Sequence, residues 1–281
     1  MWIHFLAHTS SALPPHGALV SLTDPAYGGA RTAWVKVPEG TGPWPVVIGL
    51  HGGKNRSGRA MGVRFKRAEA KDALYVYPNG LNAPPKHVAW TGPGHVEETG
   101  GDPQRDVRYI VALIEALAER YPVDTDRVYA AGFSNGGYMA HLLRCSAPER
   151  FAGFAIVSKA LPLPIDAMCQ PDPARPTILM VGTDDAGARD SHVMPMPQTL
   201  ERMRTTQGCS EASTKMELAD TGDDTVVTRH TWTECTAPFV YYEVGGGQHA
   251  WPGHGSGPGI SQDLQATSEI LRFFGLVGRA K

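Results

Sequence analysis

The chain has 281 residues, of which 42% are hydrophobic and 19% are charged, so it is long enough to bury one sizeable core. Its formal net charge of −2 is too small to indicate binding to nucleic acid or to an anionic membrane surface. No hydrophobic run approaches the roughly 18 residues of a membrane span, and no basic residue precedes Arg31 to suggest a secretory signal. We predict a single domain over 1–281, with an irregular N-terminal segment over 1–28.

Short hydrophobic runs predict buried strands along the whole chain. Unbroken runs, rather than alternating ones, are typical of a sheet that is covered on both faces. A further segment, 221–235, is rich in β-branched and polar residues and predicts either an extra hairpin or a late strand. The predicted buried strands are, in chain order, 32–37, 46–50, 74–77, 128–131, 154–157, 178–181 and 239–244.

Three segments between these strands have the hydrophobic period of a helix. In 105–121, the residues Val107, Ile110 and Ile114 recur every three or four positions and form part of one face. Segments 135–145 and 261–274 also predict helices. Strands that alternate with helices predict an α/β fold, in which a mostly parallel central sheet is flanked by helices.

The pentapeptide Gly132-Phe133-Ser134-Asn135-Gly136 has the form G-x-S-x-G. At this glycine content the string arises by chance in roughly one chain in five, so its context matters. A predicted strand leads into it and a predicted helix leaves it, which is the arrangement of a nucleophile elbow. The alternative is an ordinary glycine-rich turn, which this context disfavours. We therefore predict that Ser134 is a catalytic nucleophile.

A serine nucleophile needs a base, and the base needs a carboxylate that orients it. In this arrangement the chain order is serine, acid, histidine. The candidate acids Asp184, Asp185 and Asp190 follow the strand 178–181, at the sheet edge where active sites gather. Aspartate is also common in turns. Since Asp184 and Asp185 cannot both be buried and charged at low cost, we expect one of them to face solvent.

Four histidines follow the candidate acids Asp184 and Asp185. His249 comes after a predicted strand in the loop GGGQHAWPG, whose glycines allow the imidazole to swing over the sheet edge. We favour His249 as the base and keep His254 as the alternative. His192 shares the acid loop. His230 lies in an alternating run, where we expect a histidine on the sheet surface.

The segment Leu50-His51-Gly52-Gly53 follows a predicted strand early in the sheet. The second donor to the oxyanion of an acyl-transfer reaction comes from a loop in this position. We predict that the backbone N–H groups of Gly53 and Asn135 form the oxyanion hole. His51 precedes the serine in the chain, so we expect its role to be structural.

Four segments of the chain resemble the α/β-hydrolase family of polyhydroxybutyrate-depolymerase-like and feruloyl-esterase-like enzymes. The resemblance covers about residues 30–275 and implies an α/β-hydrolase fold with no large lid domain. The four segments are LHGG (50–53), DVRYIVALIEALAERYPVDTDRVYAAGFSNGGYMA (106–140), VGTDD (181–185) and GGGQHAWPG (245–253).

The resemblance implies a catalytic triad of Ser134, Asp185 and His249, which favours Asp185 over Asp184. The chain differs from the family pattern in two places. Gln248 stands between the glycines and His249, and the stretch after Asp185 lacks the family's usual proline-containing continuation. Because of the second difference, Asp190 stays an alternative acid.

The four cysteines also fall where this family has cysteines. The resemblance implies two disulfide bonds, Cys145–Cys169 and Cys209–Cys235, and a secreted or periplasmic protein. Each bridge closes a loop of about 25 residues, which contributes roughly 3 kcal/mol in the chain-entropy model. Without the resemblance, four buried thiols are the expected state in a chain of this length, and no Cys-x-x-Cys pair indicates zinc.

The predicted activity is hydrolysis of carboxylic esters through an acyl-enzyme, with no metal and no organic cofactor. Trp90 and Trp251 are candidate substrate-binding residues that would form an aromatic wall, and packed tryptophans are the alternative. We expect aromatic esters of the feruloyl type, or hydroxyalkanoate polyesters and oligomers, as substrates. The partner is then an ester, in some cases a polymer. An acetyl-polysaccharide esterase, a peptidase and a non-catalytic binding protein are the alternatives.

Overall fold

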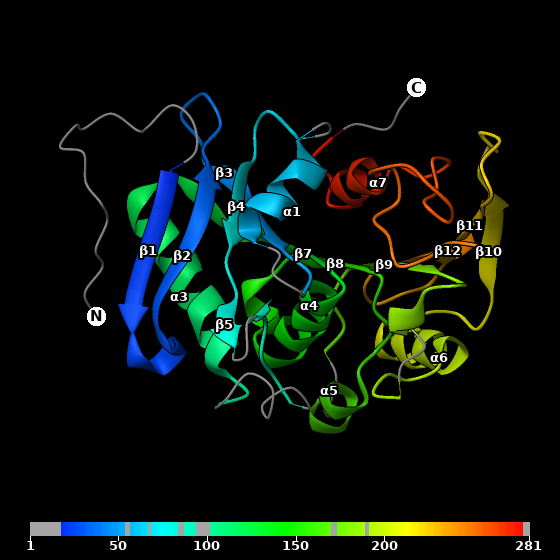
Figure 1. The fold of residues 1–281 in the computed structure, drawn as a ribbon, viewed down its shortest axis with the longest axis horizontal. Helices are drawn as coiled ribbons and strands as arrows, with labels where there is room; N and C mark the ends of the chain where they lie inside the picture. Colours follow the sequence, from blue (N-terminus) through cyan, green and yellow to red (C-terminus); the bar gives the residue numbers. More distant parts are fainter. Residues whose placement is uncertain are drawn as a thin grey trace.

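The computed structural model describes residues 18–53, 57–66, 69–83, 87–93, 102–169, 173–188 and 191–277. A ten-stranded sheet in the order β1-β2-β4-β3-β7-β8-β9-β12-β11-β10 runs through the molecule (Figure 1). The central strands from β4 to β12 pair in parallel, whereas both edges pair antiparallel. The strands are β1 (Ala18–Asp24), β2 (Gly29–Lys36), β3 (Trp44–Leu50), β4 (Leu74–Pro78), β7 (Val123–Phe133), β8 (Gly153–Val157), β9 (Thr177–Gly182), β10 (Ser213–Glu217), β11 (Val226–Trp232) and β12 (Phe239–Gly245).

Helices connect these strands, and a short hairpin of β5 (Leu81–Ala83) and β6 (His87–Ala89) follows β4. Within the described ranges, no helix is both long enough and apolar enough to cross a membrane. The helices are α1 (Gly58–Phe65), α3 (Arg105–Arg120), α4 (Asn135–Ser146), α5 (Leu163–Met168), α6 (Met196–Thr206) and α7 (Ala266–Phe273), with 3-10 turns at Pro25–Tyr27, Pro148–Arg150 and Ala186–Ala188.

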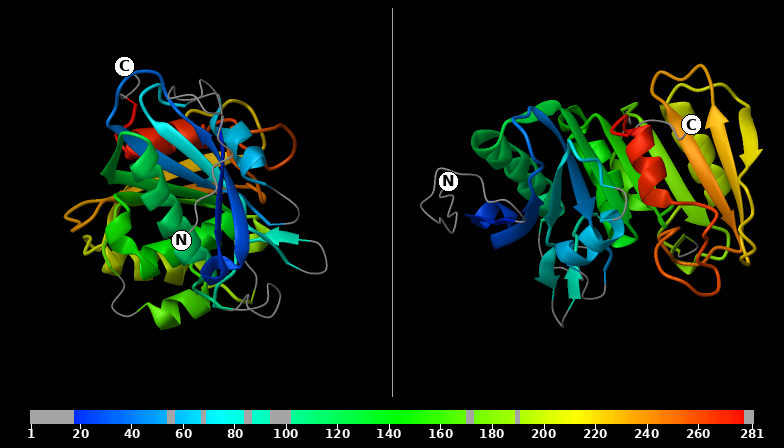
Figure 2. Two further views of the ribbon diagram at one scale, coloured as in Figure 1. Left: turned by 90° about the vertical axis from the view of Figure 1, so that its left-hand side faces the viewer. Right: turned by 90° about the horizontal axis from the view of Figure 1, so that it is seen from above.

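The central strands pack into two hydrophobic clusters, one on each face of the sheet. On β3, Val46 and Ile48 belong to one cluster and Val47 to the other. Residues of α3 and α4 complete the first cluster, and residues of α1 and α7 complete the second. This burial on both faces explains the unbroken hydrophobic runs. Figure 2 shows that the sheet is twisted and that its β1 and β10 edges lie at opposite ends of the molecule.

The α/β architecture and all seven predicted strands are present, as are the three predicted helices. The segment 261–274 contains a shorter helix than predicted, because α7 begins only at Ala266. In 221–235 the alternative of a late strand is confirmed: the segment contains the single strand β11, which pairs with β10 before it and with β12 after it. Most of β10 is exposed, so it carries no hydrophobic pattern from which a strand could be predicted.

The prediction of an irregular segment over 1–28 is wrong for residues 18–24, which form β1. Val20 and Leu22 are buried there, while the intervening Ser21 is only partly buried. This is the alternation of an edge strand that is covered on one face. It spans only two buried positions, which is too short to stand out from the surrounding polar residues. Residues 1–17 lie outside the described part of the chain.

Two buried histidines make the stability of the fold depend on pH. Burial lowers the pKa of His141 in α4 to about 3 and that of His51 to about 4. Both are therefore neutral when folded, whereas the unfolded chain takes up protons as the pH falls below about 6.5. The stability that they contribute is present above that pH and is lost as the pH falls towards their folded pKa values.

We expect the free energy of unfolding to decrease between pH 7 and pH 5.5, with about 1 kcal/mol of the loss due to His141. Urea titrations at the two pH values measure this loss. A His141→Gln variant, which has no titrating group at that position, should lose about 1 kcal/mol less than the wild type over the same interval. An identical loss in both proteins would contradict the assignment.

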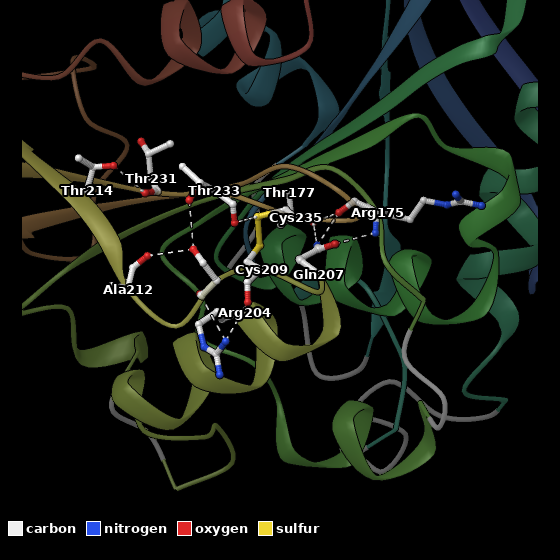
Figure 3. The surroundings of a disulfide bond; sticks show 11 residues. Arg175, Thr177, Arg204, Gln207, Cys209, Ala212, Thr214, Thr231, Thr233 and Cys235 are labelled. Atoms are coloured by element: carbon white, nitrogen blue, oxygen red, sulfur yellow. Dashed lines mark hydrogen bonds between the residues drawn. A yellow bond between two sulfur atoms is a disulfide. The ribbon is translucent and has the colours of Figure 1, made fainter.

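Both disulfide bonds are confirmed. Cys145, in the last turn of α4, is bonded to Cys169, which caps α5. Cys209, after α6, is bonded to Cys235, between β11 and β12 (Figure 3). Beside the second bond, the buried amide of Gln207 donates hydrogen bonds to the Arg175 carbonyl and to the Thr177 hydroxyl. The segment that this disulfide closes is therefore also hydrogen-bonded, through Gln207, to the start of β9.

Replacing Cys209 and Cys235 together by alanine should lower the free energy of unfolding by about 3 kcal/mol. The reason is that the bond closes a loop with a sequence separation of 26 and so lowers the conformational entropy of the unfolded chain. Urea unfolding without reductant measures the loss. With reductant present, the wild type and the double variant should unfold at nearly the same urea concentration, and a persistent difference would contradict this explanation.

Candidate active site

Ser134 lies at a sharp turn between β7 and α4. Its φ is 57°, in the left-handed region that non-glycine residues rarely adopt. The turn can close because Gly132 has no Cβ. A Cβ built at this position would lie 2.0 Å from the Gly136 carbonyl oxygen, which is too close. Likewise, a Cβ at Gly136 would lie 2.1 Å from the carbonyl oxygen of Leu50 on β3. Both glycines are therefore required by close packing, and the local geometry is that of a nucleophile elbow.

Three side chains that are distant in sequence meet at this turn. The Nε2 atom of His249 lies 2.8 Å from Ser134 Oγ, and its Nδ1 atom lies 2.7 Å from Asp185 Oδ1. Asp185 is fully buried, whereas the side chain of His249 is 37% exposed. The imidazole thus stands between a buried carboxylate and a hydroxyl within reach of solvent.

The surroundings of Asp185 favour its ionised form. Burial, the largest single cause, raises the pKa of this carboxyl, but the interactions with His249, Ser158 and the Gly187 N–H together lower the pKa below its ordinary value. The backbone N–H groups of Gly187 and Ala188 also donate to Oδ1, at 2.8 and 3.3 Å. The carboxylate can therefore accept the Nδ1 proton of His249 and leave Nε2 free to accept the proton of Ser134.

The alternative acids and bases occupy other positions. Asp184 is exposed, and its backbone N–H donates to the carbonyl of Gly247. Asp190 lies outside the described residues. The backbone N–H of His254 donates to the carbonyl of Trp251. His230 lies on β11 but is buried rather than on the surface, with its ring 5.3 Å from the ring of Tyr241.

Two residues of the site were not singled out in the sequence. A Cβ at Gly187 would lie 2.7 Å from His249 Cε1, so only glycine lets the acid loop approach the imidazole this closely. Ser158 is buried at the end of β8 with a φ of 57°, and its hydroxyl donates to the carbonyl of Ala250 at 3.0 Å. This bond ties the histidine loop to the sheet. Gly187 could have been found in the sequence, because it is a glycine two residues after a candidate acid. No local sequence feature marks Ser158.

Gly53 and Asn135 lie next to each other. A Cβ at Gly53 would be 3.6 Å from Asn135 Cβ, and one at Gly52 would be 3.5 Å from Ser134 Cβ. Asn135 is the first residue of α4, so its N–H has no partner within the helix. Within the described part of the chain, no hydrogen bond is found for the N–H of Gly53 either. Among the described residues, neither of these two donors beside the serine has a backbone hydrogen-bond partner.

His51 is structural, as predicted. It is fully buried, its Nδ1–H donates to the carbonyl of Gly52 at 2.7 Å, and its Nε2 accepts from the N–H of Gly80 at 2.8 Å. Both ring nitrogens are thus used. Neither is left for proton transfer with Ser134.

The prediction that Trp90 and Trp251 form an aromatic wall for substrate is wrong, and the packed alternative is confirmed. Trp90 is 0% exposed and Trp251 is 2% exposed. Each indole N–H is satisfied inside the protein, by the carbonyl of His51 at 2.9 Å and by the hydroxyl of Thr267 at 3.1 Å. A buried tryptophan needs such a partner, and this requirement fixes both rings in the core.

Known proteins resemble parts of this chain in sequence. The prolyl oligopeptidase family model matches residues 70–160, which include the elbow. The putative esterase NocK of Nocardia uniformis subsp. tsuyamanensis is 34% identical over 152 residues, which are 53% of this chain and 41% of the relative. A probable feruloyl esterase C of Aspergillus niger is 28% identical over 181 residues, which are 56% of this chain and 60% of the relative. The chain spans about half the length of the curated relatives it matches.

Solved structures share the fold at low sequence identity. An acetyl xylan esterase from Aspergillus awamori has a TM-score of 0.64 at 16% identity, and the match covers 93% of this chain and all of the other. A feruloyl esterase module from Clostridium thermocellum has a TM-score of 0.57 at 12% identity, and the match covers 96% of this chain and 92% of the other. The class that the fold defines is the α/β hydrolases. The chain has this fold, and the relatives that it matches include proteins named feruloyl esterases.

Proposed function

We propose that the protein is a serine carboxylesterase that uses Ser134, His249 and Asp185 as a catalytic triad. The observation that carries the proposal is the unbroken hydrogen-bonded series from Asp185 Oδ1 to His249 and on to Ser134 Oγ, at 2.7 and 2.8 Å. These distances suit direct proton transfer between the serine and the base. The elbow geometry and the esterases among the relatives support it.

In the acylation step, His249 Nε2 accepts the proton of Ser134 as Oγ bonds to the ester carbonyl carbon. The carbonyl oxygen becomes an oxyanion, which accepts hydrogen bonds from the N–H groups of Gly53 and Asn135. The bond between this carbon and the alcohol oxygen then breaks. His249 returns the proton to the leaving alkoxide, and the acyl group stays on Ser134.

In the deacylation step, water takes the place of the alcohol. His249 accepts a proton from water as its oxygen attacks the acyl carbon, and a second oxyanion forms beside Gly53 and Asn135. The carbon–Oγ bond breaks, and His249 gives its proton back to Ser134. Asp185 stays ionised throughout and stabilises the imidazolium that forms in both steps.

For the substrate, we propose aromatic esters of the feruloyl type or hydroxyalkanoate polyesters and oligomers. The relatives that are named feruloyl esterases support the first class. The exposure of the His249 side chain supports access for bulky esters. The two disulfide bonds support a secreted or periplasmic location, since such bonds persist in oxidising compartments.

A panel of substrates tests the proposal. It contains p-nitrophenyl acetate, p-nitrophenyl butyrate, methyl ferulate, hydroxybutyrate oligomers, acetylated xylan and a proline-containing peptide p-nitroanilide. We expect turnover of the p-nitrophenyl esters and of methyl ferulate or the oligomers, and no cleavage of the peptide. Preference for acetylated xylan would support the acetyl esterase instead. No turnover of any ester would overturn the proposed function.

A further inference from the structure

Trp90 lies between the two segments that carry the proposed oxyanion donors. It follows the β5–β6 hairpin and is completely buried, although it does not belong to a helix or strand. Its backbone and its indole ring make hydrogen bonds in two different directions. One set of bonds reaches the elbow that holds Asn135, and the other reaches the loop that holds Gly53.

Towards the elbow, Trp90 and the side chain of Asn135 form a reciprocal pair. The Trp90 N–H donates to Asn135 Oδ1 at 2.8 Å, and Asn135 Nδ2 donates to the Trp90 carbonyl at 3.3 Å. Two bonds to one short side chain fix its orientation. The backbone N–H of the same residue, which begins α4, is thereby held in place as well.

Towards the other loop, the indole N–H of Trp90 donates to the carbonyl of His51 at 2.9 Å. The two rings also pack together, with their centroids 4.9 Å apart. His51 is itself fixed by its bonds to Gly52 and Gly80. Since burial lowers the pKa of His51 to about 4, the ring stays neutral and keeps these bonds at neutral pH. The position of Gly53, two residues further on, depends on this arrangement.

The segment that carries Trp90 has further anchors besides Asn135 and His51. The N–H of Thr91 donates to Asp106 Oδ2 at 2.6 Å, and the other carboxylate oxygen accepts from Arg31 at 2.6 Å. All three of these side chains are buried. The Tyr138 hydroxyl donates to the carbonyl of Pro93 at 2.5 Å. The segment that carries Trp90 is therefore held by Asp106 of α3 and Tyr138 of α4 as well as by its contacts with Asn135 and His51.

We propose that Trp90 is a positioning residue that holds the Gly53 and Asn135 segments at the separation needed to bind one oxyanion. The inference rests on the proposed esterase function, because it assigns a structural basis to the oxyanion hole of that reaction. Each donor must lie about 2.7–3.1 Å from the oxyanion, so a small change in separation weakens at least one of the two bonds. The loss should fall on the transition state rather than on the bound ester.

The test is a Trp90→Phe variant, which keeps an aromatic ring but removes the indole N–H. We expect kcat for p-nitrophenyl acetate to fall by about 10- to 100-fold, with KM changed less than about twofold. Benzeneboronic acid, whose adduct with serine is tetrahedral, should bind more weakly by a similar factor. Inhibition by acetate, the product acid, and the pH midpoint of kcat/KM should both stay as in the wild type, because His249 is untouched.

Trp44→Phe is the matched control. Trp44 is also buried, but it begins β3 at the end opposite to the His51 loop, so the same truncation should leave kcat unchanged. An Asn135→Ala variant, which keeps the backbone N–H, should reproduce the effect of Trp90→Phe on kcat and on boronic acid binding. It carries the test if Trp90→Phe does not fold.

Three results would overturn the inference: an unchanged kcat in Trp90→Phe, an equal loss in the Trp44→Phe control, or a parallel weakening of acetate inhibition. All three presuppose an active wild-type enzyme. A wild type without ester turnover would instead overturn the proposed function, and this inference with it.

Discussion

Replacing Ser134 by alanine should lower kcat for p-nitrophenyl acetate by at least about 10⁴-fold. The substitution removes the atom that bonds to the acyl carbon, and the proposed mechanism has no second nucleophile at that position. Alanine has the same Cβ as serine, so the strained φ of 57° is neither relieved nor made worse. The protein should fold as before, and the oxyanion donors and the base should stay in place.

Two measurements make this result specific to the nucleophile. A fluorophosphonate probe should label the wild type covalently and fail to label Ser134→Ala. A Ser146→Ala variant, at the opposite end of the same helix, should keep wild-type turnover and labelling. Equal rates in wild type and Ser134→Ala would show that another group performs the hydrolysis, and the elbow would then be only a turn.

The sequence was sufficient to name the residues that meet at the site. The elbow could be found because its chemistry is local: a buried strand, two glycines and a helix all lie within one short segment around Ser134. The order of the elements brings the ends of neighbouring parallel strands to one edge of the sheet, which limited the acid to Asp184, Asp185 or Asp190 and favoured His249 as the base. The family resemblance then favoured Asp185. The structure places His249 within hydrogen-bonding distance of both Asp185 and Ser134.

The tryptophans show where this reasoning stops. Trp251 lies two residues after His249, whereas Trp90 lies 45 positions from Asn135, and in neither case does the sequence determine which way the side chain points. The direction depends on partners such as the His51 carbonyl and the Thr267 hydroxyl, which come from other elements. Ser158 is hidden for the same reason, because its bond to Ala250 joins residues separated by 92 positions.

Replacing Asp185 by asparagine should lower kcat by about 10³- to 10⁴-fold while leaving the fold intact. The carboxylate accepts the Nδ1 proton of His249, which leaves Nε2 able to accept the proton of Ser134. An asparagine amide can donate to Nδ1 instead, and the imidazole proton then resides on Nε2. In that tautomer the base cannot accept the serine proton, although every atom stays near its original position.

The same substitution at each of the three candidate acids decides which one serves the triad. Asp184→Asn should keep wild-type kcat, because Asp184 is exposed and Asp185, not Asp184, is hydrogen-bonded to His249. Asp190→Asn tests the remaining acid of the same loop and should also leave kcat unchanged. If either of these variants lost more activity than Asp185→Asn, the 2.7 Å contact with His249 would be structural, and the triad would have to be reassigned. The carboxylate that sets the tautomer of His249 therefore determines whether Ser134 can act as a nucleophile.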